Sequence, residues 1–247
     1  MKDLFSLEGK TALVTGGGHG IGEMIARGLA GQGARVFVCS RNPGDGDDAI
    51  TPISADLSRG DEILRLAREM SERADRLDIL VNNSGVTWGA PIDEFPESGW
   101  DKVIDLNLKS PFFLTQALLP LIEKAASAND PGRIVNIGSV DGLHVGLFEA
   151  YSYAASKAGI HHLTRIMAKF LAPRHITVNA IAPGPFESKM MKPILDKMGD
   201  DMAGSVPLRR LGRPDDMAGA AVYLTSRAGA YVTGATLVVD GGLATTA

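Results

Sequence analysis

The chain has 247 residues, of which 45% are hydrophobic and 22% charged, a composition typical of a soluble globular domain. The formal net charge of -4 gives no sign of a nucleic-acid-binding face, and no apolar stretch reaches the roughly 18–20 residues that a membrane-spanning helix needs. The single cysteine, Cys39, excludes an internal disulfide and is expected to be a small buried side chain. The first ten residues lack the apolar core of a signal peptide, so we expect a cytoplasmic protein.

Short apolar runs rich in β-branched residues alternate along the chain with longer segments of helical spacing. The expected strands are residues 10–15, 34–39, 50–54, 77–83, 132–139, 175–183 and 235–240, and the expected helices are 20–31, 60–74, 97–126, 153–172 and 214–226. Most of the strand runs are continuously apolar, which is typical of a parallel sheet covered on both faces. The pattern therefore predicts a single α/β domain with a doubly wound, Rossmann-type parallel sheet in three layers.

Two connections are unusual for such a fold. Residues 41–49, "RNPGDGDDA", are too few and too rich in glycine and aspartate for a normal crossover helix. Residues 185–207 are long, rich in methionine and bounded by prolines. Long segments of this kind often close over a site, so we predict a substrate lid at about 185–207.

A glycine-rich turn follows the first strand in "TALVTGGGHGIG". Its glycines at 16, 18, 20 and 22 permit a tight turn and let backbone N–H groups approach a pyrophosphate, with a helix N-terminus behind them. A turn that merely permits packing is the alternative. Its place on the first strand-helix connection favours dinucleotide binding by Gly16, Gly18, Gly20 and Gly22.

The end of the second strand indicates which nicotinamide cofactor binds. Dinucleotide sites that accept a free ribose 2′-hydroxyl usually place a carboxylate there, whereas this chain has Ser40 and Arg41. A guanidinium can bind a 2′-phosphate, so the sequence favours NADP(H) over NAD(H). The alternatives are that Arg41 is a solvated loop residue, or that the acids at 45, 47 and 48 offset it.

The stretch "YSYAASK" contains two tyrosines and one lysine. Tyr153 and Lys157 are four residues apart, on one face of a helix, and a nearby ammonium lowers the pKa of a phenol. Tyr153 is therefore predicted to be a proton donor. Tyr151 has Ala155 at that spacing; it is expected just before the helix, where it could border a substrate pocket.

Six motifs then fall in one order and spacing: "TGGGHGIG", "NNSG", the asparagine of "DLNLKS", the serine of "NIGS", "YAASK" and "PG". Together they resemble the short-chain dehydrogenase/reductase family over nearly the whole chain. The nearest similarity is to the 3-oxoacyl-carrier-protein reductases and their relatives linked to rhamnolipid synthesis. The resemblance implies catalytic roles for Asn107, Ser139, Tyr153 and Lys157: a relay water, the substrate carbonyl, the proton, and the nicotinamide ribose.

The same resemblance implies further contacts with the cofactor. They are expected at His19, Ile21, Asp56, Leu57, Asn83, Gly85, Pro183, Gly184, Phe186 and Ser188, besides Tyr153 and Lys157. His19 is a departure, because reductases of this group often carry arginine there. Ser84 stands where alanine is usual, a small change that should fit.

The expected substrate side is apolar. Substrate contacts are predicted at Ser139, Leu143, His144, Phe148, Tyr151, Tyr153 and Met190, with Leu147, Phe186 and Met191 completing an apolar approach. These apolar side chains could equally be lid packing, and His144 could be a solvent-exposed loop residue. The five histidines lack metal-ligand spacing with carboxylates or cysteines, so no metal site is predicted.

These observations predict an NADP(H)-dependent carbonyl reductase. The expected substrate is a 3-oxoacyl thioester of acyl-carrier protein or CoA, or a similar apolar β-keto compound. A sugar, polyol or other secondary-alcohol dehydrogenase is an alternative, and a nucleotide-sensing regulator is a second, disfavoured by the intact catalytic set. No nucleic acid or membrane partner is expected. The resemblance implies a homotetramer, and "PLRRLGR" at 207–213 is either a carrier-docking patch or a solvated loop.

Overall fold

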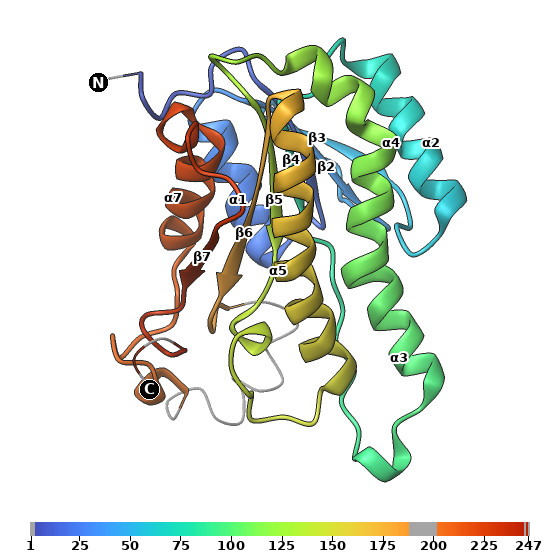
Figure 1. Cartoon of the computed structure of the whole chain (residues 1–247), viewed down its shortest axis with the longest axis vertical. Coiled ribbons are helices and arrows are strands. Elements are labelled where there is room, and N and C mark those ends of the chain that lie inside the picture. Colours follow the sequence, from blue (N-terminus) through green and yellow to red (C-terminus); the bar gives the residue numbers. More distant parts are fainter. Residues whose placement is uncertain (1–2, 188–201, 245, 247) are drawn as a thin grey trace.

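The computed structural model describes residues 3–187, 202–244 and 246. Its centre is a seven-stranded parallel sheet with the strand order β3-β2-β1-β4-β5-β6-β7 (Figure 1). The strands are β1 (Thr11–Thr15), β2 (Arg35–Ser40), β3 (Ile50–Ser54), β4 (Ile79–Asn82), β5 (Gly132–Ile137), β6 (Ile176–Pro183) and β7 (Thr236–Val239). The doubly wound parallel sheet predicted from the continuous apolar runs is confirmed.

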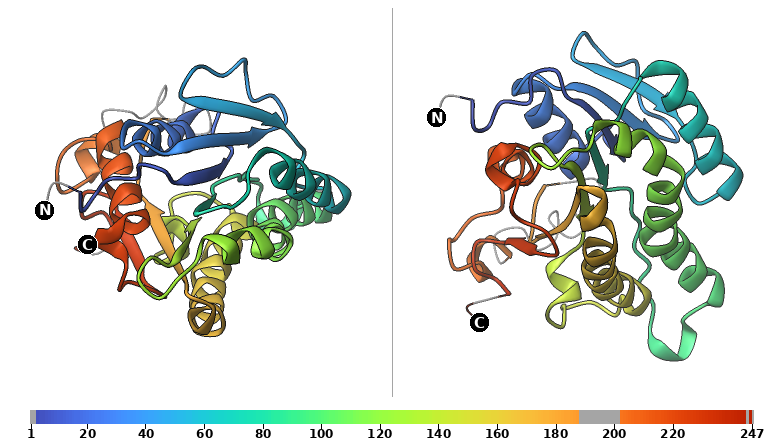
Figure 2. Two further views of the ribbon diagram at one scale, coloured as in Figure 1. Left: turned by 90° about the horizontal axis from the view of Figure 1, so that it is seen from above. Right: turned by 45° about the horizontal axis from the view of Figure 1, so that its top comes forward.

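Helices cover both faces of this sheet. They are α1 (Gly20–Gly31), α2 (Gly60–Arg73), α3 (Glu97–Ile104), α4 (Ser110–Ala125), α5 (Tyr151–Leu171) and α7 (Pro214–Thr225). One core lies between the sheet and α1 with α7, and the other lies between the sheet and α2, α4 and α5. Figure 2 shows these helices as separate outer layers on either side of the strands.

The strand order reverses at β1: β2 and β3 lie on one side of it, and β4 to β7 lie on the other. Strand β1 pairs on one side with β2, where Leu13 lies opposite Phe37, and on the other with β4, where Leu13 lies opposite Leu80. Both neighbours run parallel to β1, so their carboxyl ends meet at one edge of the sheet. In open α/β sheets this switch point is where ligands bind.

Most expected boundaries differ from the structure by one or two residues, and three differences lie near the site. The predicted helix 97–126 is divided by a π-helical turn, Asp105–Lys109, and the predicted strand 132–139 ends at Ile137. Ser139 then caps a 3-10 turn, η3 (Val140–Gly142), where its hydroxyl accepts a hydrogen bond from Asp141 N at 3.2 Å. Tyr151 is the first residue of α5 instead of preceding the helix.

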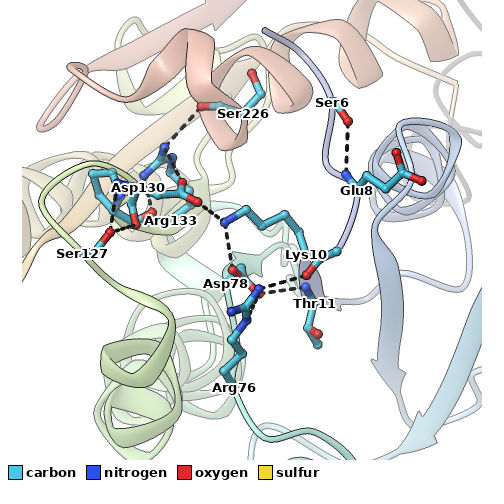
Figure 3. Close-up of polar contacts among 12 residues, drawn as sticks. Ser6, Glu8, Lys10, Thr11, Arg76, Asp78, Ser127, Asp130, Arg133 and Ser226 are labelled. Carbon is cyan, nitrogen blue, oxygen red and sulfur yellow. Dashed lines mark hydrogen bonds and ion pairs between the residues drawn. The ribbon is translucent and has the colours of Figure 1, made fainter. Parts of the chain in front are cut away.

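The opposite, amino-terminal edge of the sheet carries a network of charges (Figure 3). Asp78, which is 3% exposed, accepts a hydrogen bond from Thr11 N at 2.9 Å and pairs with Lys10 at 3.0 Å and with Arg76 at 3.3 Å. Lys10 also pairs with Asp130. These residues tie together the starts of β1, β4 and β5, and they lie at the edge away from the ligand-binding ends of the strands.

A second, uncharged network lies in the core between the sheet and the helices α4 and α5. Asn82 Nδ2 donates to Asn136 Oδ1 at 2.9 Å and to Thr115 Oγ1 at 3.3 Å, and Asn136 Nδ2 donates to Thr164 Oγ1 at 2.9 Å. All four side chains are at most 4% exposed. Two strands and two helices are therefore joined through side-chain hydrogen bonds.

Asn136→Ala is expected to lower the free energy of unfolding by about 2–4 kcal/mol, because it leaves the amide of Asn82 and the hydroxyl of Thr164 buried with one partner fewer. Denaturant unfolding of the purified protein measures this change. Thr164→Val, which preserves shape and removes one hydroxyl, is the milder control and should cost about 1 kcal/mol. Equal stability of Asn136→Ala and the wild type would contradict the role of the network.

Candidate active site

The predicted catalytic residues come together at the carboxyl ends of the central strands. Ser139 follows β5, while Tyr153 and Lys157 lie on the first two turns of α5, which pack against η3. Lys157 Nζ lies 5.5 Å from the centroid of the Tyr153 ring and donates a hydrogen bond to the carbonyl of Ile137 at 2.8 Å. The prediction that Tyr153 and Lys157 lie on one face of a helix is confirmed.

Burial controls the acidity of both groups. It raises the pKa of Tyr153 to about 12, and the Ser139 hydroxyl beside the phenol has an opposite, smaller effect. Burial also lowers the pKa of Lys157 to about 8. Desolvation of the phenol is the largest effect on the pKa of Tyr153, and a lowering of that pKa by the Lys157 ammonium stays a prediction. Tyr153 is therefore protonated at neutral pH and can act as an acid.

This arrangement gives a pH dependence for carbonyl reduction. Lys157 is an ammonium below its pKa of about 8, where it stabilises the phenolate that Tyr153 becomes on donating its proton. We expect kcat/KM for reduction to be flat below about pH 8 and to fall above it, as Lys157 loses its charge. A pH profile of the wild type and of Lys157→Met checks this. The variant should lack the fall near pH 8, and an identical fall in both would contradict the assignment.

Asn107 lies in the π-helical turn, a local irregularity that often occurs at functional sites. Its Oδ1 accepts a hydrogen bond from Val86 N at 2.9 Å, and its Nδ2 donates to Val86 O at 2.9 Å and to Ser156 Oγ at 3.1 Å. A Cβ added to Gly85 would lie 3.3 Å from Asn107 Oδ1 and 3.7 Å from Lys157 Nζ, so these residues are neighbours. The side chain of Asn107 clamps the loop after β4 to α5, and its part in a proton relay stays a prediction.

The glycine turn packs so closely that there is no room for a Cβ at Gly16, Gly17 or Gly22. Gly16 has a φ of 65°, and a Cβ added to Gly22 would lie 2.2 Å from Gly16 O. Asn83 holds this turn, because its Nδ2 donates to Thr15 O at 2.8 Å. Thr15 Oγ1 in turn accepts hydrogen bonds from the backbone N–H groups of residues 83 and 84, both at 2.9 Å. The turn therefore leads directly into the N-terminus of α1, a geometry suited to a pyrophosphate.

The end of β2 offers groups for the 2′-phosphate side of a cofactor. The buried hydroxyl of Ser40 has no hydrogen-bond partner among the described residues, and Arg41 is exposed. Asp47, one of the acids that weakened the case for NADP(H), is already paired with Arg27 of α1. A Cβ added to Gly18 would lie 3.2 Å from Pro43 O, so the 41–49 connection lies against the glycine turn. A hydroxyl without a partner among the described residues and an exposed cation at this edge fit NADP(H).

Other predicted cofactor residues have structural contacts of their own. Asp56 Oδ1 accepts hydrogen bonds from Ser58 N and Ser58 Oγ at 3.1 and 2.7 Å, and Leu57 is buried in the core. Phe186 is 2% exposed and packs its ring against Gly212. The remaining predicted positions lie on the surface of the glycine turn (His19, Ile21), at the end of β6 (Pro183, Gly184), or outside the described residues (Ser188, Met190, Met191).

Apolar side chains are exposed in the loop that follows Ser139. In the loop after η3, Leu143, Val145, Leu147 and Phe148 are 47%, 95%, 82% and 51% exposed. His144, in the same loop, is half-buried, with its Nδ1 2.8 Å from Val145 O. The loop that follows Ser139 therefore presents mainly apolar surface.

Tyr151 lies roughly on the opposite side of α5 from Tyr153, because two residues turn a helix by about 200°. Its hydroxyl donates to Glu149 Oε1 at 2.6 Å, and its ring meets Phe95 edge-on at 5.7 Å between centroids. It lines a shallow apolar pocket with side chains of α3 and the preceding loop, including Trp100. The structure thus groups Tyr151 with α3, and its role in substrate specificity stays a prediction.

Two supporting residues were missing from the sequence-based site. Thr15 holds the loop after β4 against the glycine turn, and Ser156 bridges Asn107 to Tyr153 O, to which it donates at 2.7 Å. A threonine directly before the glycines was the only available signal for the first. Nothing in the spacing of "YAASK" marked Ser156.

The arginines of 207–213 were a candidate carrier-docking patch. Arg210 makes two hydrogen bonds to the carboxylate of Asp216, at 2.6 and 3.0 Å, and this pair holds the N-terminus of α7. Arg209 donates to Gly204 O. Both side chains therefore have structural partners, which weakens the patch as a docking surface.

The described residues contain no group of histidine, cysteine or acidic side chains placed to hold a metal ion. Within the same described ranges, none of the helices combines the length and apolar character needed to cross a bilayer.

Known proteins resemble this chain over its whole length. It matches the family model described as enoyl-(acyl carrier protein) reductase over residues 16–244. It is 47% identical to the rhamnolipids biosynthesis 3-oxoacyl-[acyl-carrier-protein] reductase of Pseudomonas aeruginosa, over 98% of this chain and 99% of that protein. It is 39% identical to the 2-dehydro-3-deoxy-D-gluconate 5-dehydrogenase of Bacillus subtilis, over 98% and 97%. The solved Pseudomonas aeruginosa RhlG/NADP active-site complex has a TM-score of 0.93 and 46% identity, covering 99% of this chain and 100% of that one.

Proposed function

Because the chain belongs to the short-chain dehydrogenase/reductase family, we propose that it is an NADP(H)-dependent carbonyl reductase acting on a 3-oxoacyl thioester or a similar apolar β-keto compound. The family resemblance drawn from the sequence motifs is confirmed. The observation that carries the proposal is the shared site of Ser139, Tyr153 and Lys157 beside an apolar loop. The required ketone is present in a 3-oxoacyl thioester of acyl-carrier protein and equally in one of CoA.

The choice of NADP(H) is supported by the glycine turn, the orphaned Ser40 hydroxyl and the exposed Arg41. The similar RhlG structure is an NADP complex. In our proposal Arg41 and Ser40 hold the 2′-phosphate, while the turn from Gly16 to Gly22 receives the pyrophosphate. When bound, the cofactor supplies the hydride.

The chain's own residues handle the substrate carbonyl. Ser139 donates a hydrogen bond to the carbonyl oxygen, which orients it toward Tyr153. Tyr153, protonated at neutral pH, transfers its proton to the oxygen as negative charge develops there. The ammonium of Lys157 stabilises the phenolate that remains. The same steps in reverse oxidise an alcohol, which requires Tyr153 to be deprotonated and is favoured at higher pH.

The exposed apolar loop favours an acyl substrate over a sugar. Leu143, Leu147 and Phe148 follow Ser139 within nine residues and offer few polar groups for hydroxyls. The Bacillus subtilis relative is a sugar-acid dehydrogenase, so a sugar remains the competing substrate class.

A substrate screen tests the proposal. NADPH oxidation by the purified protein is compared for acetoacetyl-type thioesters, cyclic ketones, and keto-sugars. We expect the thioesters to have the highest kcat/KM, by about tenfold or more, because each buried methylene contributes about 0.8 kcal/mol. If a keto-sugar is the best substrate, the proposed substrate class is wrong. If the protein oxidises NADPH with none of the carbonyl compounds, the proposed function is refuted.

We further infer that the chain forms a single domain and assembles as a cytoplasmic homotetramer. The lid predicted at about 185–207 lies mostly outside the described residues, which stop at 187 and resume at 202. The outer faces of α4 and α5 support the assembly, since Phe112, Phe113, Ile166 and Phe170 are exposed there. Exposed apolar patches of this kind often mark protein interfaces. Phe170→Glu is expected to shift the protein to smaller species in sedimentation equilibrium, and an unchanged tetramer in this variant would place the interface elsewhere.

A further inference from the structure

The turn that carries Ser139 is fixed to α5 at three points. Lys157 Nζ donates to Ile137 O at 2.8 Å, just before the turn. A Cβ added to Gly142 would lie 2.5 Å from the carbonyl carbon of Lys157, so the end of the turn lies flat on the helix backbone. The third point is the contact between Gly138 and His161, a residue with no role in the chemistry above.

His161 follows Lys157 by one helical turn on the same face of α5 and is 5% exposed. A Cβ added to Gly138 would lie 1.9 Å from His161 Nε2 and 2.6 Å from its Cδ2. The ring therefore fills the space beside Gly138, the residue directly before Ser139. Because real Cβ atoms do not approach this closely, residue 138 must be glycine for the turn to rest on the ring.

The imidazole of His161 is uncharged and acts through its packing. Neither ring nitrogen reaches hydrogen-bond geometry with a described residue, although the Gly142 backbone lies near enough to the ring to favour its charged form. Burial, together with the positive charges of Lys157 and Arg165 on the same helix, lowers the pKa of His161 to about 4, against a smaller opposing effect of the Gly142 backbone. The ring is therefore neutral at physiological pH, and its size and flat shape, instead of its charge, account for the close fit.

We propose that His161 is a positioning residue for Ser139: its ring sets the height of the Gly138–Ser139 turn above α5 and so the distance from the serine hydroxyl to Tyr153. The inference rests on the proposed role of Ser139 in binding the substrate carbonyl. A displacement of about 1 Å at such a hydroxyl can lower turnover by up to about 100-fold, so a misplaced turn has a measurable effect.

A double-mutant cycle between positions 138 and 161 tests this contact. Gly138→Ala should lower kcat about tenfold or more because its methyl group collides with the ring, and His161→Ala should lower kcat similarly because the turn loses its support. In the double variant the new methyl group occupies part of the vacated space, so kcat should recover above that of either single variant. If the fold-loss of kcat in the double variant equals the product of the losses in the two single variants, the proposal is overturned.

Two further variants separate shape from chemistry. His161→Leu, which is of similar size and lacks ring nitrogens, should retain kcat within about threefold. His162→Ala, at the exposed neighbouring histidine, is the matched control and should behave as the wild type. NADPH affinity should change less than about threefold throughout, since the glycine turn is untouched. A leucine variant as slow as the alanine variant would show that a ring nitrogen acts, which overturns a purely positioning role.

Thermal unfolding distinguishes this inference from the proposed function. A wild type that reduces no carbonyl would refute the proposed function. The unfolding midpoints of the four proteins of the cycle would still report on the contact itself. Midpoints that recover in the double variant support the packing of His161 on Gly138, and midpoints that add independently refute it.

Discussion

Tyr153→Phe is expected to lower kcat for ketone reduction by about 10³-fold, within the range that a general acid contributes. The phenol lies beside the Ser139 hydroxyl, and the centroid of its ring is 5.5 Å from Lys157 Nζ. The substitution removes one hydroxyl and leaves the half-buried ring in place. NADPH binding should remain within a few-fold of the wild type, because Lys157 keeps its hydrogen bond to Ile137 O.

Tyr151→Phe is the matched control for this experiment. It removes the hydroxyl of a tyrosine two residues away, which donates to Glu149 on the other side of the helix. Its kcat should stay within about threefold of the wild type. Full activity of Tyr153→Phe would refute the proton-donor role, and equal losses in both variants would indicate a general disturbance of the start of α5.

Arg41→Ala is expected to raise the KM for NADPH by about 10- to 100-fold and to leave the KM for NADH nearly unchanged. A hydrogen bond to a charged group contributes about 1.5–3 kcal/mol, and NADH lacks the 2′-phosphate that Arg41 would bind. Steady-state kinetics with both cofactors and one ketone measures the difference. The acid that could have competed for Arg41, Asp47, is paired with Arg27 and should not compensate.

Arg73→Ala provides the control for a change of net charge. Arg73 is an exposed arginine that pairs with Glu69 in the last turn of α2. Its loss should leave both KM values unchanged. If Arg41→Ala raised the KM for NADPH and for NADH equally, the assignment of the 2′-phosphate to Arg41 would be wrong.

The sequence predicted those parts of the fold and site that depend on local spacing. Continuous apolar runs such as "TALVT" and "RVFVCS" became central strands, because a strand buried on both faces needs no polar side. The four-residue spacing of Tyr153 and Lys157 likewise translated directly into a shared helical face.

Features that depend on contacts between distant segments were beyond the sequence. The π-helical turn at 105–109 places Asn107 against Val86 and Ser156, neither of which is adjacent in the chain. Burial raises the pKa of Tyr153, and this burial depends on the whole site, so the spacing of Tyr153 and Lys157 could not show it. The opposite orientation of Tyr151, by contrast, follows from helical geometry once α5 is seen to begin at that residue.

Deuterium transfer from NADPH labelled at the nicotinamide C4 tests the central claim most directly. The wild-type protein is incubated with the labelled cofactor and a 3-oxoacyl thioester, and the product is analysed by mass spectrometry and NMR. A carbonyl reductase with Tyr153 as the acid should give a 3-hydroxyacyl product with deuterium on the carbon that bears the new hydroxyl, and Tyr153→Phe should give almost none. Deuterium at another carbon, or equal labelling by the wild type and the variant, would contradict the mechanism.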